Sequence, residues 1–198
     1  MRLSRWALTI MMVVPMVMAV AAQQPAPAAG GQRGPANPPM RLTSTSFPDG
    51  GVIPVKYSQA GEQISPALSW TNTPPGTVSL VLHMHDQEGA RNKTTDDQLH
   101  WLVWNIPAST TSFPENVPTG VDRPDGSHQV SARNPGYMGP GAGAAGPMHH
   151  YTFELYALDT KIDIPAGEPF ETRTNVIKAM QGHILGKAVY VGLFHRPE

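Results

Sequence analysis

Cysteine is absent from all 198 residues, so the chain forms no disulfide and offers no thiol nucleophile or thiolate metal ligand. Charged residues are scarce, at 15%, and no stretch concentrates lysine or arginine. Binding to nucleic acid and electrostatic docking on an anionic bilayer both use a basic patch. We therefore expect no nucleic-acid partner and no docking of this kind.

Long apolar runs are also rare, and the one that stands out extends from Trp6 to Val20. Two arginines precede it and small residues ending at Ala22 follow it, which is the pattern of a secretory signal peptide. A retained membrane anchor is the alternative, but the run is short for a span of about 20 residues and Pro15 interrupts it. We predict a signal peptide over residues 1–22, and a periplasmic or secreted protein with no stable membrane span after cleavage.

The next segment, residues 23–39, is built mostly from Gln, Pro, Ala and Gly. Such a composition cannot bury a core, so the segment is predicted to be a disordered tether. Residues 40–198 then form one domain of ordinary size. Loss of Arg2 and Arg5 with the leader reduces 14 basic residues to 12 against 15 acidic ones, a net charge of −3.

Proline and glycine recur about every ten residues in the domain, which favours short strands joined by turns. Two nearly continuous apolar segments predict buried strands, namely 78–85 (VSLVLHMH) and 99–106 (LHWLVWNI). Alternating apolar residues over 151–157 predict a strand with one buried face. Further short strands are expected at 40–47, 52–55, 65–70 and 188–194. Without βαβ alternation, the fold class is mostly β, a β-rich α+β domain with a largely antiparallel sheet.

One helix is predicted over Thr172–Lys187, where apolar residues recur at helical spacing and Gly186 could end the helix. His183 lies on the apolar side of this pattern and is expected to be a packed structural histidine.

Residues 119–148 carry almost no periodic pattern, although hydrophobic strands flank them. A stretch this long inside a compact domain is usually disordered or functional, and we expect a functional loop. Residues 141–146 match G-x-G-x-x-G, but a dinucleotide site needs a strand before the motif and a helix after it. Here a strand follows, so the glycines are interpreted as a loop whose backbone N–H groups can approach an anion.

His83 and His85 share one face of a predicted strand, because residues two apart point the same way. A metal site would need further ligands, for which Asp86, His100 or His149 are candidates. The alternative is that two histidines line a sheet face without metal. We expect no metal site and no cofactor.

Several polar residues lie at strand ends. Asp86 and Glu88 follow one buried strand, His100 begins the next, and His149 and His150 join the glycine loop to the alternating strand. These groups could hold a polar ligand, or they could form ordinary ion pairs of little consequence. The sequence has neither G-x-S-x-G nor a P-loop, and no clear nucleophile is apparent.

Six segments, taken in order, resemble the phosphatidylethanolamine-binding protein family, and bacterial members called Raf kinase inhibitor-like proteins in particular. The resemblance covers about residues 40–196. The segments are ISPALSW (64–70), DQEGA (86–90), HWLVWNIP (100–107), GYMGP (136–140), HHYTFELYALD (149–159) and GHILG (182–186).

This resemblance implies a central antiparallel sheet flanked by a smaller sheet, with one or two helices near the C-terminus. It also implies a small pocket for phosphate or phospholipid head groups. The ligand-binding residues carried over from the family are Asp86, Glu88, His100, Gly139, Pro140, His149 and Tyr151. The chain has D-Q-E-G-A where the family has D-P-D-A-P, and a glycine-rich run where the family has G-P-x-P-P-x-G.

The resulting hypothesis is an exported binding protein that performs no catalysis and takes a small anionic ligand or a phospholipid head group. One alternative is an inhibitor that acts through its surface on a partner protease or kinase. A second is a metal-assisted hydrolase that uses Asp86, His100 and His149.

Overall fold

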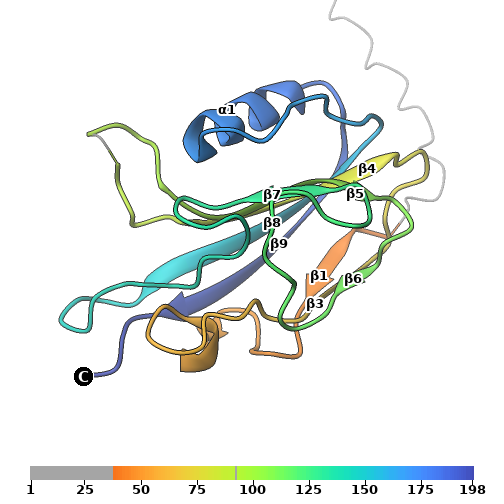
Figure 1. The fold of residues 1–198 in the computed structure, drawn as a ribbon. Helices are drawn as coiled ribbons and strands as arrows, with labels where there is room; N and C mark the ends of the chain where they lie inside the picture. The colour runs from red at the N-terminus through yellow and green to blue at the C-terminus, as the bar shows by residue number, and fades with distance from the viewer. Residues whose placement is uncertain (1–37, 92) are drawn as a thin grey trace, which may run out of the picture. The chain divides into compact units, whose positions relative to one another are not determined.

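The computed structural model describes residues 38–91 and 93–198 (Figure 1). The predicted signal peptide, and the predicted tether up to residue 37, lie outside the described residues. Among the residues that are described, no helix combines the length and the apolar character needed to cross a membrane.

The larger sheet has six strands in the order β2–β9–β8–β4–β5–β7. Their bounds are Gly51–Val52 (β2), Ser79–Asp86 (β4), Gln98–Pro107 (β5), His128–Val130 (β7), His149–Leu158 (β8) and Ile184–Phe194 (β9). All neighbours pair antiparallel except β2 and β9, which are parallel. The two continuous apolar runs form β4 and β5, as predicted, and β4 is buried along its whole length.

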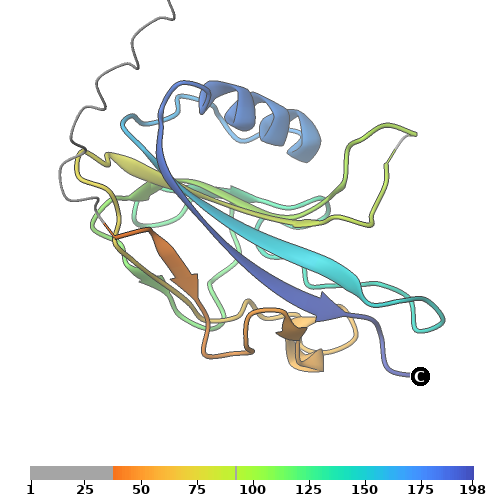
Figure 2. The ribbon, with the colours of Figure 1, turned by 180° about the vertical axis from the view of Figure 1, so that it is seen from behind.

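A smaller antiparallel sheet of β1, β3 and β6 lies on one side of the larger sheet, and the helix α1 lies on the other (Figures 1 and 2). The bounds are Arg41–Thr43 (β1), Leu68–Thr71 (β3), Ser112–Phe113 (β6) and Pro169–Ala179 (α1), and a single 3₁₀ turn covers Val55–Tyr57 (η1). The predicted class, mostly β with a second sheet and a C-terminal helix, is therefore confirmed.

The layers enclose two hydrophobic cores, one on each face of the larger sheet. Leu80, Leu82 and Met84 of β4 pack toward the smaller sheet, while Val81 packs toward α1. Because side chains alternate along a strand, Asp86 lies on the small-sheet face, and His83 and His85 lie on the helix face. This division separates the two polar clusters described below.

The predicted helix over 172–187 was wrong in its second half. Glu168 caps α1 by accepting a hydrogen bond from the Glu171 backbone N–H (2.8 Å), and Pro169 begins the helix. Gly182, with φ of +86°, ends the turn that follows, and the chain then enters β9. The apolar residues at the end of α1 and at the start of β9 happen to follow helical spacing, so the sequence pattern continued past the end of the helix.

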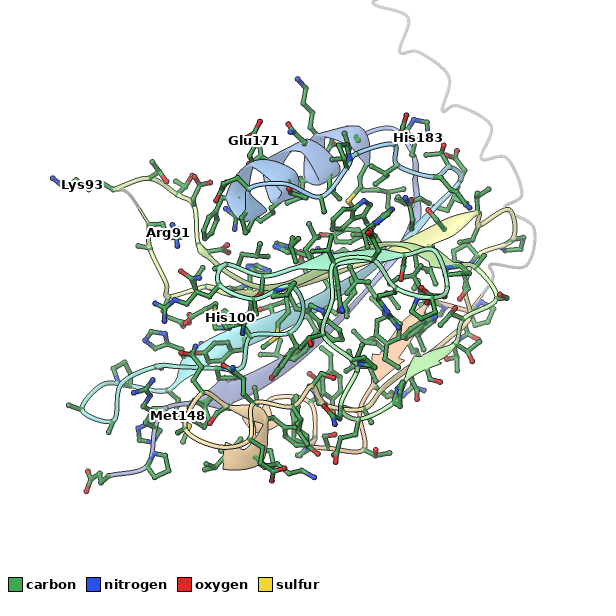
Figure 3. The ribbon with its side chains drawn as sticks, in the orientation of Figure 1. Arg91, Lys93, His100, Met148, Glu171 and His183 are labelled. Atoms are coloured by element: carbon green, nitrogen blue, oxygen red, sulfur yellow. The ribbon has the colours of Figure 1, made fainter. Side chains whose placement is uncertain are left out.

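Two predicted roles fail with that boundary. Gly186 is a strand residue rather than a helix cap, and a Cβ there would lie 2.7 Å from Pro74. His183 is a half-exposed surface residue beyond the helix (Figure 3), and its Nδ1 lies 2.7 Å from Asp159. The long stretch 119–148 is likewise not structureless, since β7 adds an edge strand beside β5.

Candidate functional site

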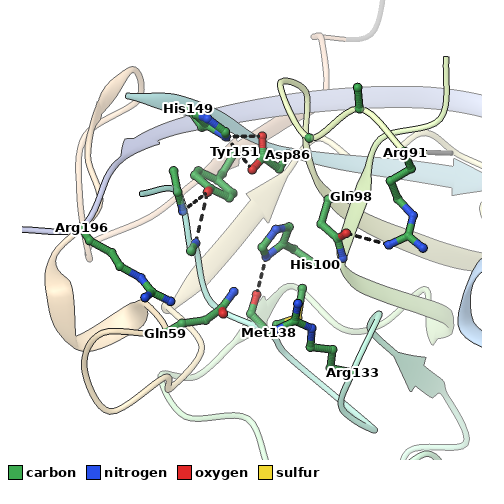
Figure 4. A pocket seen from close by; sticks show the side chains of 14 residues that line it. Gln59, Asp86, Arg91, Gln98, His100, Arg133, Met138, His149, Tyr151 and Arg196 are labelled. Carbon is green, nitrogen blue, oxygen red and sulfur yellow. Dashed lines mark hydrogen bonds and ion pairs between the residues drawn. The ribbon is translucent and has the colours of Figure 1, made fainter. Parts of the chain in front are cut away.

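A cavity of about 340 Å³ opens where the ends of β4, β5 and β8 meet the glycine-rich loop (Figure 4). Its volume lies at the lower end of the range for small-molecule sites. It is lined by Gln59, Asp86, Gly89, Ala90, Arg91, Gln98, His100, Arg133, Met138, Gly141, Ala142, His149, Tyr151 and Arg196.

Asp86 and His149 form a hydrogen-bonded pair at one wall. Asp86 is the last residue of β4 and is only 5% exposed, and His149 is the first residue of β8. The His149 Nδ1 lies 3.0 and 2.9 Å from the two carboxylate oxygens of Asp86. A carboxylate that bonds one ring nitrogen orients the imidazole and leaves Nε2 for another partner.

His100 reaches the cavity because β5 carries an irregularity. The pairing of β4 with β5 steps from Met84–Trp101 to His85–Leu99 and skips His100. Such bulges re-aim side chains, and here His100 packs edge-on against the Tyr151 ring, 5.0 Å between centroids.

The His100 ring is held in one tautomer. The carbonyl of Met138 lies 2.9 Å from Nδ1, and a carbonyl can only accept, so Nδ1 carries the proton. Burial lowers the pKa of His100, which favours the neutral ring. Neutral His100 therefore offers Nε2 as an acceptor, which suits an O–H or N–H of a ligand.

Tyr151 joins the strand to the glycine loop. Its hydroxyl oxygen accepts hydrogen bonds from the backbone N–H groups of Gly141 (3.2 Å) and Ala142 (3.1 Å). Burial, and then the nearby Asp86 carboxylate, raise the pKa of Tyr151 well above 10. The hydroxyl thus keeps its proton, and the two loop N–H groups expected to face an anion are already satisfied by it.

The loop itself is anchored by Gln59, which also lines the cavity. Gln59 donates its side-chain N–H to the Gly139 carbonyl (2.8 Å) and its backbone N–H to the Pro140 carbonyl (2.9 Å). A Cβ on Gly139 would lie 2.3 Å from the Tyr57 carbonyl oxygen, so glycine is required by close approach. Gly139 and Pro140 are buried, and they position the loop rather than line the cavity.

The structure brings together four of the seven predicted ligand-binding residues, namely Asp86, His100, His149 and Tyr151. Glu88 is not part of the cavity lining. Its carboxylate accepts the His150 backbone N–H (2.8 Å) and lies 2.6 Å from the His150 Nδ1, in an exposed position. Glu88, Gly139 and Pro140 are therefore supporting residues in this geometry.

Three arginines in the lining were missed by the sequence analysis. Arg91 stacks on the Phe170 ring and donates to the Gln98 side-chain oxygen at 2.8 Å. Arg133 and Arg196 are exposed, and among the described residues neither forms an ion pair. Arg91 and Arg133 come from separate loops and Arg196 from the C-terminal segment after β9, and isolated basic residues of this kind carry no pattern that points to a shared site.

The metal ligands suggested from the sequence do not assemble as expected. Asp86, His100 and His149 lie on the small-sheet side of β4, so they cannot complete a site with His83 and His85 on the helix side. One cation could lie between Asp86, Glu88 and His149, whose ligand atoms are within 4.8 Å of one another. In the structure those atoms instead pair among themselves and with His150.

Known proteins are similar to this chain in sequence and in architecture. The model of a family described as phosphatidylethanolamine-binding protein matches residues 43–195. A UPF0098 protein of Methanothermobacter thermautotrophicus is 40% identical over 159 residues, which are 79% of this chain and 99% of that protein. LppC of Mycobacterium tuberculosis, which bears the name of a lipoprotein, is 32% identical over 183 residues, 91% of this chain and 81% of its own length.

Solved structures agree with these matches. A homologue of phosphatidylethanolamine-binding protein, CT736 from Chlamydia trachomatis, aligns with a TM-score of 0.66 and 30% identity, and covers 82% of this chain and 100% of that chain. E. coli YbcL has the same fold at 24% identity and a TM-score of 0.65, covering 80% of this chain and 99% of its own. Because the family model matches residues 43–195 and the Methanothermobacter protein is 40% identical over 99% of its own length, the chain belongs to the phosphatidylethanolamine-binding protein family.

Proposed function

We propose that the cavity binds a small phosphorylated ligand, either free or as the head group of a phospholipid, without covalent chemistry. The observation that carries this proposal is the charge of the lining, which combines Arg91, Arg133 and Arg196 with one carboxylate, Asp86. Arginine matches phosphate oxygens in charge and in donor geometry. The volume of about 340 Å³ exceeds that of a bare phosphate and leaves room for a short polar extension.

The histidines select among such ligands. Neutral His100 presents an acceptor, so it favours an oxyanion that still carries a proton, or a ligand with an adjacent hydroxyl or ammonium group. His149, oriented by Asp86, supplies the second imidazole. Together with the arginines, these groups suit a phosphate monoester or phosphoethanolamine better than a fully apolar lipid.

Catalysis is not part of the proposal. The lining contains no serine, threonine, cysteine or lysine to serve as a nucleophile, and Tyr151 keeps its proton. Export is proposed on the leader-like residues 1–22 and on the lipoprotein name borne by LppC.

The test is a titration followed by NMR and calorimetry, with inorganic phosphate and phosphoethanolamine as probes. We expect saturable binding by the native chain, loss of binding in His149→Ala, and a weakening of about tenfold in Arg133→Gln, or about 1.4 kcal/mol. His150→Ala is the matched control, because the neighbouring histidine pairs with Glu88 outside the cavity lining. If His149→Ala gave the same phosphate titration curves as the native chain, phosphate would not bind in this cavity and the proposal would be wrong. Micelles of short-chain phosphatidylethanolamine separate head-group binding from binding of free phosphate.

A further inference from the structure

A second polar cluster lies on the opposite face of the larger sheet, beneath α1. His83 and His85 extend from β4 on this face, and their rings stack 4.5 Å apart and 3° from parallel. Glu154 of β8 is the register partner of His83. Its Oε2 lies 3.6 Å from the His83 Nδ1 and 3.7 Å from the His85 Nε2.

The two imidazoles are buried and incompletely satisfied. His83 is 6% exposed and His85 is 9% exposed. Among the described residues, the Nε2 atoms of both rings have no hydrogen-bond partner. Buried polar atoms are almost always paired, so an unpaired one needs an explanation such as an ion or a water. The His85 Nε2 atom is the one that faces the Glu154 carboxylate, whereas His83 faces it with Nδ1.

Neighbouring residues hold the cluster in place. The Nδ1 of His85 bonds the Asp97 carboxylate, and Arg173 of α1 donates to that same carboxylate at 2.8 Å. This leaves the lone pair of His85 on Nε2, which is the atom nearest Glu154. A histidine bonded to a carboxylate through one nitrogen, and free on the other, has the arrangement found in many metal sites.

Glu154 is also fixed. Tyr156 donates its hydroxyl to Oε2 at 2.7 Å, and Lys187 donates to Oε1 at 2.5 Å. A carboxylate oxygen that accepts one hydrogen bond still has a second lone pair for a cation. Lys187 and Arg173 oppose a positive ion, whereas Glu154, Asp97 and Asp96 favour one, so the local charge before binding is −1.

We infer that His83, His85 and Glu154 form a binding site for a divalent transition metal, with Zn²⁺ as the best-fitting ion. Imidazole nitrogens combined with one carboxylate suit zinc among the common divalent ions. Ligand atoms placed about 2.0–2.1 Å from zinc in a tetrahedron lie about 3.3–3.4 Å from one another. The 3.6 Å from His83 Nδ1 to Glu154 Oε2 and the 3.7 Å from His85 Nε2 to the same oxygen need only a small contraction, and all three ligand atoms lie within 4.8 Å of one another.

A second cavity adjoins the proposed site at His83. His83 lines a cavity of about 380 Å³ with Asp96, Asp97 and Arg173, which provides an entry path for the ion and room for a water ligand. The site is independent of the anion cavity, because its residues lie on the other face of β4 and β8.

Zinc titration of the untagged full chain by calorimetry, after treatment with a chelator, tests the inference. We expect one zinc per chain, and at least about tenfold weaker binding in Glu154→Gln and in the positioning variant Asp97→Asn. His183→Gln is the matched control, because that histidine also pairs with an aspartate, Asp159, but lies at the surface. Circular dichroism of each variant reports whether it remains folded.

NMR of the histidine ring nitrogens in the native chain gives a readout that does not depend on any variant. Zinc is expected to shift the ring nitrogens of His83 and His85 and to leave those of His149 in place. Absence of zinc binding, unchanged affinity in a folded Glu154→Gln, or shifts confined to His149 would each overturn the inference. The last result would place the ion between Asp86, Glu88 and His149 instead.

Discussion

The two faces of the larger sheet treat histidine differently. On the small-sheet face, His149 and His100 lie at strand ends beside a cavity, and each has one ring nitrogen bonded by a protein oxygen. On the helix face, His83 and His85 lie within β4, stacked and buried, and no described group bonds the Nε2 atom of either ring. The first arrangement suits a ligand that enters and leaves, and the second suits an ion that stays.

The two faces also differ in what holds their histidines in place. The cavity face depends on a glycine loop in which backbone atoms approach one another closely, as at Gly139. The helix face depends on side-chain ion pairs, such as Arg173 with Asp97. Substitutions that add one methyl group, or remove one hydroxyl, should therefore have unequal effects on the two faces.

The largest effect is expected from Gly139→Ala. The new Cβ would lie 2.3 Å from the Tyr57 carbonyl oxygen, a backbone atom that cannot move without shifting η1. Overpacking of this kind costs about 2–3 kcal/mol of the free energy of unfolding, and we also expect phosphate binding to be lost. Chemical denaturation measures the first effect and calorimetry the second.

Gly167→Ala, on the helix side, is the comparison for this variant. The atom nearest to the new Cβ would be the Thr172 hydroxyl oxygen at 3.7 Å, an ordinary contact, so we expect the free energy of unfolding to change by less than about 1 kcal/mol. Equal destabilisation of the two variants would show that the glycine loop is not the constrained element described here.

A smaller effect is expected from Tyr151→Phe. The change removes the oxygen that accepts from Gly141 and Ala142, and unsatisfied N–H groups near the protein interior cost about 1–2 kcal/mol. The same N–H groups then become free to bind an anion. We therefore expect the free energy of phosphate binding to weaken by less than the free energy of unfolding does. Denaturation curves and phosphate titrations on one preparation check both parts.

Tyr156→Phe gives the matching change on the helix face. Tyr156 is half-buried and its hydroxyl donates to Glu154, which keeps Lys187 as a second partner. We expect stability to change by less than about 1 kcal/mol, since no buried group is left without a partner. If Tyr156→Phe lost more stability than Tyr151→Phe, the helix face and not the cavity face would depend more on its tyrosine hydroxyl, and the comparison of the two faces would be wrong.

Much of the fold was predictable because it depends on patterns local to each strand. The apolar runs of β4 and β5 and the alternation in β8 identified the centre of the sheet. The resemblance to the family then identified Asp86, His100, His149 and Tyr151, which line one cavity in the structure.

The rest depends on pairing between distant segments. His83 and His85 were expected on one face, but their partner Glu154 follows from the antiparallel register of β4 with β8, which no local pattern encodes. Arg133 and Arg196 reach the cavity from a loop and from the C-terminal segment, so their role depends on tertiary packing. The helix was predicted too long because Ile184 of β9 continued its apolar repeat by coincidence.

The smallest expected effect is on the pH dependence of stability, and it tests His100. Burial lowers the pKa of His100 below the value of about 6.5 that it has when unfolded, although the Asp86 carboxylate opposes this shift. As the pH falls below 6.5, the unfolded chain binds the proton first, so stability present above 6.5 is lost progressively down to the folded-state pKa. The slope from one such group stays below about 1.4 kcal/mol per pH unit.

His100→Gln should reduce this dependence. Glutamine can still donate to the Met138 carbonyl and does not titrate, while the other histidines are common to both proteins. The free energy of unfolding, obtained from denaturation curves between pH 7.5 and 5, should therefore fall more for the native chain than for the variant. The two plots of this free energy against pH should converge as the pH falls. Parallel curves would mean that His100 titrates alike in the folded and unfolded states, and that its ring is not kept neutral by burial.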